Sequence, residues 1–443
     1  MKIAVVGGGI SGLGAAWLLA RQHDVTLFEA GATLGGHSNT VELRLDGRPV
    51  AVDTGFIVYN EHTYPNLTRL FDALGVETVA SDMSFAVSLD AGAFEYAGDA
   101  RGVLAQPVNL VRPEFWRLFG EMMRFYREAP HLAERYDLEA LTLGQLLSAG
   151  GYSDLFARRH ILPMAAAIWS STLDEILDFP ARSFVQFFDN HGLFSLGERP
   201  QWRSVLGGSR RYVAALSRPF RDRVRLAAPI EGLRRTSRAA RLRDASGAEH
   251  DFDQVVLATH ADQALRILGE GASPAEREVL GAFRYRANRA VLHRDPTLMP
   301  RRRRVWASWN YLGEGDGEAG GRISVSYWMN RLQRLETRRD VFVTLNPLRE
   351  PAPRLTHGEF LYHHPQFDRP ALDAQRRLPD IQGLARVWFC GSYCGYGFHE
   401  DGLQAGFAVA AALGAPAPWA SEVRPMSPAW RAAAPSVAAV AAE

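Results

Sequence analysis

The first forty residues of the chain alternate short apolar runs with a glycine-rich turn and a helical stretch. Residues 2–6 form one apolar run and residues 25–28 form another, with Glu29 directly after it. The sequence GGGISGLG at residues 7–14 separates the first run from the helical stretch. Strand, glycine turn, helix, strand and acid in this order predict a dinucleotide-binding unit. A glycine turn that binds no ligand is the alternative, and the helix and the acid together argue against it.

The glycines of this turn have separate expected roles. Gly7 permits the tight turn, Gly9 lets the backbone approach a pyrophosphate, and Gly12 lets the helix and the strand pack closely. The start of the helix, which includes Ser11, offers free N–H groups and a partial positive charge to phosphate oxygens. Glu29 stands where a carboxylate accepts hydrogen bonds from ribose hydroxyls.

Two later parts of the chain carry further apolar runs of strand length. About residues 203–265 contain two such runs, the second at residues 253–259. About residues 384–415 contain one run, the turn at Gly391 and Ser392, and an Ala-rich helical pattern. Both parts have the pattern of additional strands and a helix in an α/β domain.

The blocks between these parts, about residues 81–202 and 266–383, are expected to form a second domain. Residues 111–137 have a helical, amphipathic pattern in which aromatic and methionine side chains alternate with arginines. One interpretation is a core-facing helix, and the other is an apolar channel mouth that rests on a membrane surface. Residues 283–346 contain several β-like runs, which predict a mixed sheet that lines a pocket. Residues 416–443 form an Ala- and Pro-rich tail that we expect to be loosely ordered.

Composition narrows the possible chemistry. The formal net charge of +1 gives no indication of general nucleic-acid binding. The two cysteines, Cys390 and Cys394, exclude a disulfide framework. Their spacing fits no thioredoxin-type redox pair, and no histidine cluster accompanies them at zinc spacing, so we expect no metal site. Lys2 is the only lysine, so no interior lysine can form a Schiff base or act as a tuned amine.

The compartment is inferred from the ends of the chain and its apolar runs. The first predicted strand begins within a few residues of the N-terminus, so we expect no cleavable signal before it. No apolar run is long enough to span a bilayer. A cytoplasmic protein is therefore expected, and peripheral contact with a membrane stays open.

The residues after Glu29 resemble the FAD motif of the flavin amine oxidase superfamily, which includes monoamine oxidase, protoporphyrinogen oxidase and phytoene desaturase. That motif has an acid, a short spacer and Gly-Gly-Arg. Here Ala30 begins the spacer, Gly35 and Gly36 follow, and His37 stands where arginine is usual. The two glycines permit close backbone approach.

The resemblance implies further contacts to FAD. Residues 53–56, with Gly55 and Phe56, resemble the family segment beside the isoalloxazine ring. Ile230 resembles the aliphatic residue that covers the adenine. Gly391 and Ser392 resemble an Ala-Gly-Asp turn, with serine in place of the usual aspartate. The later residues Gly402 and Leu403 open the helix whose N-terminal dipole favours the negative charge of reduced flavin.

The resemblance also implies the architecture. We expect an α/β fold in which a Rossmann-like FAD-binding domain is interleaved with an α+β substrate domain, as in amine oxidases. The FAD-binding domain would comprise residues 1–80, 203–265 and 384–415. The substrate domain would comprise residues 81–202 and 266–383.

In such enzymes the flavin accepts a hydride from a substrate C–H bond. Amine oxidases of the superfamily hold a lysine at the flavin and flank the amine with two aromatic rings, and the lysine is missing here. Phe398 matches one ring position, and a second wall could come from residues 362–365, which include Tyr362 and His364. An exposed loop before a proline is the alternative for those residues. His399 is either an acid or base or a structural hydrogen-bonding group.

Residues 37 and 397–402 add a more specific resemblance. Together they match a bacterial subgroup of predicted NAD/FAD-binding, amine-oxidase-like proteins, which carry Gly-Gly-His and Gly-Phe-His-Glu-Asp-Gly. That subgroup often occurs beside cyclopropane-fatty-acid-synthase-like methyltransferases, which implies an acyl-chain substrate. Trp169 and Trp202 lie in segments that the family uses near substrate, although most tryptophans are core residues.

These observations predict an FAD-dependent oxidoreductase that abstracts a hydride from an apolar small molecule or lipid, such as an acyl chain, as a desaturase or dehydrogenase. The electron acceptor is left open. An amine oxidase without the usual lysine is one alternative. Another is a flavin-free lipid carrier like the Rab GDP-dissociation inhibitors, which share this fold but have no need for Glu29, the Gly35-Gly36 pair and the C-terminal flavin segment together.

Overall fold

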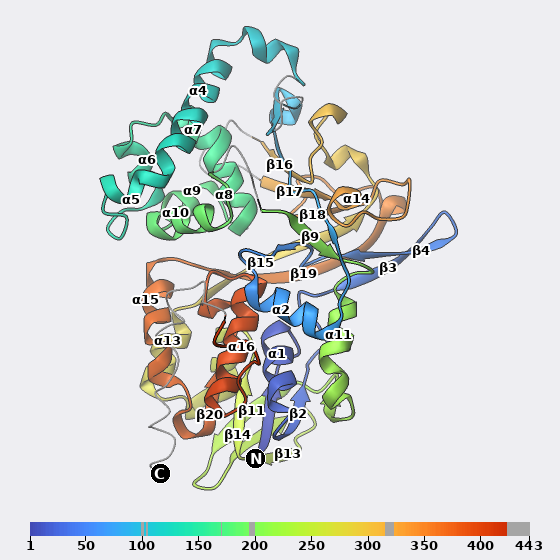
Figure 1. Ribbon diagram of the computed structural model, residues 1–443, viewed down its shortest axis with the longest axis vertical. Coiled ribbons are helices and arrows are strands. Elements are labelled where there is room, and N and C mark those ends of the chain that lie inside the picture. Colours follow the sequence, from blue (N-terminus) through green and yellow to red (C-terminus); the bar gives the residue numbers. More distant parts are fainter. Residues whose placement is uncertain (99–101, 103–104, 170, 195–199, 315–322, 423–443) are drawn as a thin grey trace.

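The chain folds into two halves that lie one above the other along the longest axis of the molecule (Figure 1). The structure is a computed structural model, and it describes all residues except 99–101, 103–104, 170, 195–199, 315–322 and 423–443. The lower half is built around a parallel sheet and the upper half around a mixed sheet. The predicted α/β fold with a Rossmann-like domain and a second α+β domain is therefore confirmed.

The parallel sheet collects strands from three distant parts of the chain. Its order is β10-β2-β1-β14-β20, and every pairing in it is parallel. The strands are β1 (Lys2–Val6), β2 (Asp24–Phe28), β10 (Val224–Arg225), β14 (Gln254–Leu257) and β20 (Val387–Phe389). A central strand of a parallel sheet is buried on both faces, which is why β1 is apolar from Ile3 to Val6, after the exposed Lys2 at its start.

Two largely buried helices, α1 (Ile10–Leu19) and α16 (His399–Ala412), lie side by side on this sheet (Figure 1). Every residue of α1 is buried, so this helix is apolar on all sides rather than amphipathic. The helices approach closely because a Cβ at Gly406 would lie only 2.1 Å from the carbonyl oxygen of Ser11. A three-stranded antiparallel sheet packs against the parallel sheet through Phe28 and Phe252. It consists of β11 (Ile230–Arg235), β12 (Ala240–Asp244) and β13 (Glu249–Phe252).

The upper half contains a seven-stranded mixed sheet in the order β19-β15-β18-β17-β16-β7-β8. The pairing of β16 with β7 is parallel and the other pairings are antiparallel, so the predicted mixed sheet is confirmed. Its strands are β7 (Phe85–Leu89), β8 (Phe94–Ala97), β15 (Arg284–His293), β16 (Trp309–Gly313), β17 (Ile323–Trp328), β18 (Phe342–Leu345) and β19 (Thr356–Gln366). Residues 362–365 belong to β19, so the exposed loop considered for them is wrong.

Helices cover one side of the upper half (Figure 1). They are α4 (Pro113–Glu128), α5 (Leu132–Arg135), α6 (Leu143–Ala149), α7 (Asp154–Phe156), α8 (Leu162–Trp169), α9 (Leu173–Leu177) and α10 (Ala181–Asn190). The predicted amphipathic helix is confirmed as α4, and it ends at Glu128 before a 3-10 turn. Its buried residues Phe115, Leu118 and Phe125 face the core, while Trp116 is 51% exposed.

Smaller elements join the two halves. The hairpin of β3 (Thr40–Leu45) and β4 (Arg48–Asp53) precedes β5 (Tyr59–Asn60), α2 (Pro65–Leu74) and β6 (Thr78–Ala80), and β9 (Trp202–Val205) pairs with β5 and β6. The remaining helices are α11 (Arg210–Ser217), α12 (Ala261–Leu268), α13 (Pro274–Gly281), α14 (Met329–Leu332) and α15 (Arg369–Arg377). In Figure 1, α13 and α15 lie in the lower half, although the predicted boundaries place them in the substrate domain.

The C-terminal segment after α16 is partly fixed. Trp419 is buried, its ring lies 6.2 Å from Trp17 and 5.9 Å from Phe407, and its indole N–H donates to Asn66 Oδ1 at 3.2 Å. The prediction of a loosely ordered tail is therefore wrong for residues 416–422, because a large aromatic side chain docks on the core. Residues 423–443 lie outside the described part of the chain.

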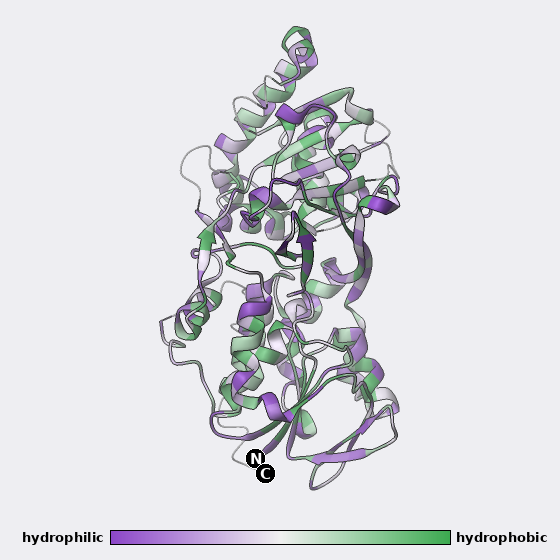
Figure 2. Cartoon of the chain, turned by 90° about the vertical axis from the view of Figure 1, so that its right-hand side faces the viewer, coloured by the Kyte–Doolittle hydropathy of each residue, from purple (hydrophilic) through white to green (hydrophobic). Residues whose placement is uncertain are grey.

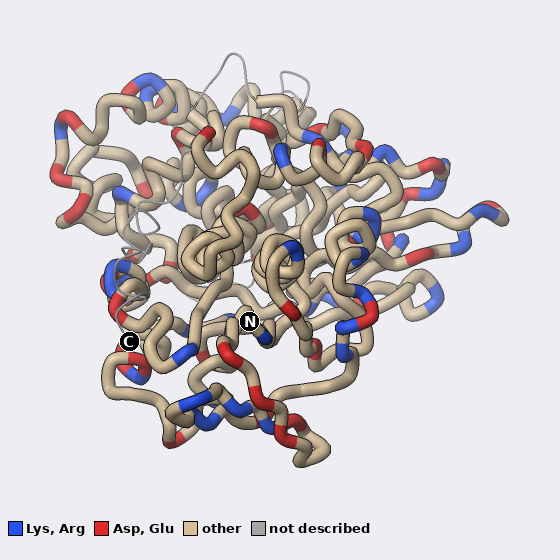
Figure 3. The backbone as a smooth tube through the Cα atoms, turned by 60° about the horizontal axis from the view of Figure 1, so that its bottom comes forward, with Lys and Arg blue, Asp and Glu red and all other residues tan. Residues whose placement is uncertain are grey.

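The surface carries both signs of charge. Hydrophobic residues concentrate in the interior elements of both halves (Figure 2). Basic and acidic residues are interspersed along the surface segments seen in Figure 3. Arg241, for example, pairs with both Glu249 and Asp251. This view agrees with the near-neutral net charge of the sequence.

Candidate functional site

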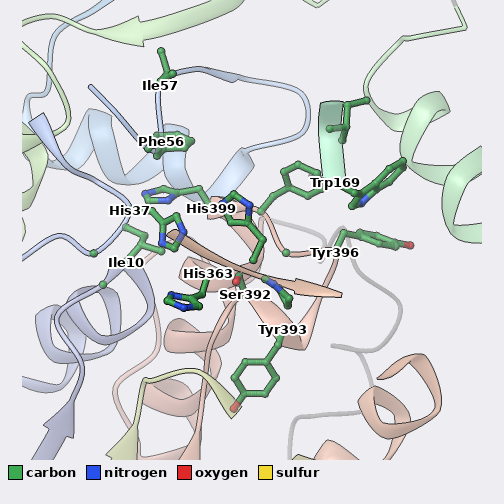
Figure 4. Close-up of a pocket in the computed structure, with 18 of the residues that line it drawn as sticks. Ile10, His37, Phe56, Ile57, Trp169, His363, Ser392, Tyr393, Tyr396 and His399 are labelled. Atoms are coloured by element: carbon green, nitrogen blue, oxygen red, sulfur yellow. The ribbon is translucent and has the colours of Figure 1, made fainter. Parts of the chain in front are cut away.

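A single cavity of about 1210 Å³ extends from the glycine turn of the lower half into the upper half. Such concave, largely apolar spaces between domains are the usual binding sites of cofactors and small molecules. Figure 4 shows His37, Phe56 and His399 on one side of this cavity and Trp169 and Tyr396 on the other. Most of the residues predicted to bind a cofactor line it: Gly7, Gly9, Ser11, Glu29, Ala30, Gly35, Gly36, His37, Gly55, Phe56, Ile230, Gly391 and Ser392.

The glycine turn has the predicted conformation. Gly7 has a φ of 111°, and a Cβ there would lie 2.5 Å from the carbonyl oxygen of Ala258. A Cβ at Gly12 would lie 1.9 Å from the carbonyl oxygen of Gly7, so this glycine permits the close packing expected of it. Gly9 differs, because its Cβ would meet nothing within 4 Å. Gly9 therefore faces open space at the start of α1, where no side chain caps the helix.

Glu29 is held across this turn by two backbone groups. Gly8 N–H donates to Glu29 Oε2 and Gly31 N–H donates to Glu29 Oε1, both at 2.6 Å. Each carboxylate oxygen keeps a further acceptor site, because an ionised carboxylate has about four. The carboxylate is thus oriented on the cavity wall and can accept hydrogen bonds from a ligand.

The second glycine pair packs directly against the first turn. Gly35 N–H donates to the carbonyl of Gly8 at 2.8 Å, and a Cβ at Gly36 would lie 3.2 Å from Gly9 Cα. Both Gly35 and Gly36 have positive φ values, 122° and 57°, which favour glycine. The two glycine segments therefore form one continuous backbone surface at the cavity.

His37 follows this pair and is buried with an unpaired nitrogen. Its Nε2 has no hydrogen-bond partner within the described residues. Its ring lies 4.9 Å from Tyr362 and 5.3 Å from His364. Burial lowers the pKa of His37 well below its usual range, and nearby His364 and His260 lower it further. The position where arginine is usual thus holds a neutral imidazole that can bond a ligand.

Phe56 and His399 form a stacked pair on the cavity wall. Their ring centroids are 3.8 Å apart, and Phe56 N–H donates to the carbonyl of His37 at 2.7 Å. His399 Nε2 lies 2.8 Å from the hydroxyl of Tyr212, and burial lowers the pKa of His399 to about 3. This geometry supports the structural alternative for His399, and an acid or base role stays a prediction.

The other residues predicted on the substrate side divide between the cavity and the core. Phe398 lines the cavity, and its ring stacks on Phe187 at 4.7 Å. His364 also lines it, and burial lowers the pKa of His364 to about 4. Tyr362 is not among the residues that line the cavity, because its ring packs against that of His37, which does line it. Its hydroxyl lies 2.7 Å from Thr54 Oγ1, behind the ring of His37.

Gly402 and Leu403, predicted to contact the cofactor, do not line the cavity either. A Cβ at Gly402 would lie 2.9 Å from Ser11 Oγ, and Leu403 packs against Gly14. One turn into α16, the helix faces α1 instead of the cavity. These two residues therefore set the spacing of the two helices.

The roles of Glu400 and Asp401 at the start of α16 were not predicted from the sequence. Glu400 accepts hydrogen bonds from the backbone N–H groups of Asn66 and Leu67, at 2.9 and 3.0 Å, and so caps α2. Asp401 accepts from Phe398 N–H at 2.9 Å and caps its own helix. Burial raises the pKa of each carboxyl to about 7. Acids at a helix start are a capping signal that the sequence already contained.

The upper part of the cavity is apolar and nearly free of charge. Its described lining includes Asp82, Met83, Phe85, Tyr96, Phe119, Met122, Met123, Tyr126, His160, Met164, Ile168, Trp169, Phe187, His191, Leu193, Trp202, Trp309 and Tyr327. His160 bonds to the hydroxyls of Tyr126 and Tyr96, at 2.5 and 2.9 Å, and burial lowers its pKa to about 3. Asp82 pairs with Arg331 at 2.8 Å.

The described residues offer no arrangement suited to a metal site, a reactive thiol or a membrane-spanning helix. No group of three or more His, Cys, Asp or Glu side chains there is arranged to hold a metal ion. Cys390 and Cys394 are buried free thiols whose pKa values are raised by burial. Among the helices of the described segments, none combines the length and apolar character needed to cross a bilayer.

Comparisons with known proteins agree with this geometry. The family model described as flavin containing amine oxidoreductase matches residues 10–291. No curated protein sequence matches the chain. The cyclohexylamine oxidase from Brevibacterium oxydans is similar in structure, with a TM-score of 0.68 and 16% identity over 93% of this chain and 98% of that one.

Two further solved structures illustrate the range of the fold. Putrescine oxidase bound to putrescine has a TM-score of 0.66 and 16% identity, over 93% of this chain and 99% of that one. A fatty acid isomerase from P. acnes has a TM-score of 0.60 and 14% identity, over 91% and 96% of the two chains. At these identities the likeness shows a shared fold.

Proposed function

Because the chain belongs to the flavin-containing amine oxidoreductase family, we propose that it is an FAD-dependent oxidoreductase that removes a hydride from an apolar substrate such as a lipid acyl chain. The observation that carries this proposal is the continuity of one cavity. The same space that begins at the glycine turn ends among aromatic and methionine side chains. A bound cofactor and an apolar substrate would therefore meet within it.

The residues at the lower end fit FAD. Gly9 faces open space before an uncapped helix start, and His37 Nε2 is a buried nitrogen that lacks a partner. Glu29 would hold the ribose, the start of α1 at Ser11 would hold the pyrophosphate, and Ile230 would cover the adenine. When bound, FAD supplies the hydride acceptor.

The protein's own contribution is to orient the substrate and exclude water. The stacked rings of Phe398 and Phe187 form a flat apolar wall, and His363 and His364 line another part of the cavity. Asp401 caps the start of α16 and Glu400 lies beside it, so the partial positive charge of this helix end is already partly balanced by the protein. Burial keeps His399 neutral, so it can hold Tyr212 by a hydrogen bond without adding charge.

Amine oxidation is supported less well. Lys2 lies at the exposed start of β1, where its backbone N–H bonds to Asp253, so it cannot serve at the cavity. An ammonium group needs acceptors, and Asp82 in the upper cavity is already paired with Arg331. Of the lysine and the two aromatic rings that amine oxidases place at the flavin, this cavity has one of the rings, Phe398.

A flavin-free lipid carrier is also disfavoured. Such a carrier would have no use for Glu29 fixed at the glycine turn or for the two fused glycine segments. The lower end of the cavity would then be polar space without a ligand.

We further propose that the substrate reaches the cavity from a membrane surface. Phe119, Met122 and Met123 of α4 line the cavity. The same region exposes large apolar side chains to solvent: Val108, Leu110, Val111, Trp116 and Met123. Exposed apolar clusters of this kind are typical of segments that insert into the bilayer interface. One helix would thus connect the lipid surface with the substrate wall.

The direct test is the colour and reduction of the purified protein. We expect a yellow protein whose flavin absorbance bleaches anaerobically with a membrane lipid extract and not with a panel of amines. Colourless protein that fails to take up added FAD would contradict the FAD proposal. Bleaching by amines alone would establish amine oxidation instead.

A further inference from the structure

We infer that the substrate carries an uncharged hydrogen-bond acceptor, such as an ester carbonyl, that the indole N–H groups of Trp169 and Trp309 recognise. This inference rests on the proposed function, because it names the polar part of the apolar substrate. It concerns the upper part of the cavity, away from the residues assigned to FAD.

The first observation is a pair of buried donors without acceptors. Nε1 of Trp169 and Nε1 of Trp309 have no hydrogen-bond partner within the described residues, and both side chains line the cavity. An indole nitrogen is a donor only, so it can pair with nothing but an acceptor. Buried unpaired donors are rare in folded proteins and usually mark a site that a ligand or water completes.

Packing holds both indoles in place. The ring of Trp169, at the end of α8, lies 4.6 Å from Phe179 and 4.9 Å from Phe187. The ring of Trp309, at the start of β16, meets Tyr327 edge to face at 4.7 Å. Neighbouring rings restrict rotation of the indoles toward other partners. The two indole N–H groups are therefore held in fixed orientations before any ligand binds.

The second observation is the absence of usable charge in this part of the cavity. Asp82 is the only acidic or basic residue of its described lining, apart from histidines, and it pairs with Arg331. Burial lowers the pKa of His160 to about 3 and that of His191 to about 4, so both rings are neutral near pH 7. A carboxylate would find no cation here, and an ammonium would find no free anion.

Neutral donors in a neutral, apolar wall therefore select a neutral acceptor. An ester, amide or ketone carbonyl satisfies an indole N–H without bringing charge into the cavity. Free carboxylates and amines of the same chain length should be rejected, because each must lose its hydration without gaining an ionic partner.

The test compares four ligands with one chain length and different ends: methyl decanoate, decanoate, decylammonium and 1-decene. Their binding to the oxidised, FAD-loaded enzyme is measured by isothermal titration calorimetry at pH 8. We expect the ester to bind about tenfold more tightly than 1-decene, and the two ions to bind more weakly than either.

Two variants and a control separate hydrogen bonding from packing. Trp169→Phe and Trp309→Phe remove an N–H group but keep an aromatic ring, and each should lower the ester-to-decene affinity ratio about threefold to fivefold. Phe119→Leu changes a cavity side chain that makes no ring contact with either indole, so it should weaken both ligands alike and leave the ratio unchanged.

Tighter binding of the carboxylate or the amine would overturn the inference. So would an unchanged ratio in both tryptophan variants, or a failure of all four ligands to bind. These outcomes are distinct from failure of the proposed function, which is seen as missing flavin or as flavin that no apolar substrate reduces.

Discussion

The aromatic ring of Phe56 stacks on the imidazole of His399, with centroids 3.8 Å apart and ring planes 8° from parallel. Phe56 follows the β3–β4 hairpin, and His399 is the first residue of α16. The contact therefore joins the N-terminal and C-terminal segments of the chain at the cavity wall. Tyr212 bonds to His399 and adds the middle segment to the same point. One small cluster thus unites all three parts of the lower half.

The two glycines Gly9 and Gly406 should respond differently to alanine. A Cβ at Gly9 would meet no atom within 4 Å, and Gly9 has a φ of −75°, which alanine also adopts. The free energy of unfolding of the Gly9→Ala apoprotein should therefore differ from that of the wild type by no more than about 1 kcal/mol. Its added methyl group would project into the FAD site, so flavin content should fall. Gly406→Ala brings Cβ to 2.1 Å from a backbone oxygen of Ser11 and should cost about 1–3 kcal/mol. Urea unfolding measures the stability of both variants, and flavin absorbance measures their FAD content. Full flavin content in Gly9→Ala would argue against an FAD site at the glycine turn.

Glu29→Ala should reduce retention of FAD. The change removes the carboxylate that we assign to the ribose and also frees the N–H groups of Gly8 and Gly31. Loss of a charge-assisted hydrogen bond of about 1.5–3 kcal/mol corresponds to a tenfold or larger rise in the dissociation constant of FAD. The ratio of flavin to protein absorbance after gel filtration reports it. Glu29→Gln keeps one acceptor oxygen, so its flavin content should lie between those of the wild type and Glu29→Ala. Unchanged flavin content in Glu29→Ala would show that another group holds the ribose.

His160 should make the protein sensitive to acid. Burial depresses its pKa to about 3 in the folded state, against 6.5 for an ordinary histidine, so protonation favours the unfolded chain. The stability that depends on the neutral ring is fully present above pH 6.5 and is lost as the pH falls toward 3. Each pH unit in that window costs about 1.4 kcal/mol.

The glutamine of His160→Gln stays neutral at every pH. Between pH 7.5 and pH 5 the free energy of unfolding of this variant should therefore fall by about 2 kcal/mol less than that of the wild type. Urea unfolding at the two pH values measures the difference. The exposed His131→Gln is the matched control and should follow the wild type. Identical pH dependence in His160→Gln and wild type would mean that His160 is solvated at low pH without unfolding.

Binding to lipid vesicles should depend on the exposed apolar residues near α4. Val111 is 79% exposed and Trp116 is 51% exposed, so replacing either with Asp should lower cosedimentation with vesicles several-fold. Leu384→Asp changes a residue that is 46% exposed in the lower half, and it should bind vesicles like the wild type. Equal loss in all three variants would indicate nonspecific adsorption, and no loss in the α4 variants would exclude this surface as the membrane contact.

Local sequence was enough to predict the glycine turn, the first two strands and the last helix. Gly7 and Gly12 could be assigned because tight turns and close helix packing require glycine wherever they occur. The mixed sheet of the upper half was also predictable from its β-like runs. The resemblance at residues 30–37 pointed to the second glycine segment, and this segment does reach the cavity.

Other features were decided only when distant segments packed together. The side of β19 on which Tyr362 lies depends on its register with β15, so the sequence could not show that it stands behind His37. Trp419 is held by Trp17 and Phe407, which no local pattern in the tail reveals. Gly402 faces α1 rather than the cavity because the two helices cross at that turn.

By itself, then, the sequence determined which backbone conformations were possible and that no lysine could act at the cavity. The tertiary structure decided which side chains face that cavity and which stay without partners. Strand and turn propensities act over a few neighbouring residues, whereas burial and hydrogen-bond pairing depend on segments far apart in the chain. The unpaired N–H groups of Trp169 and Trp309 belong to the second kind, because only the folded chain shows what surrounds them.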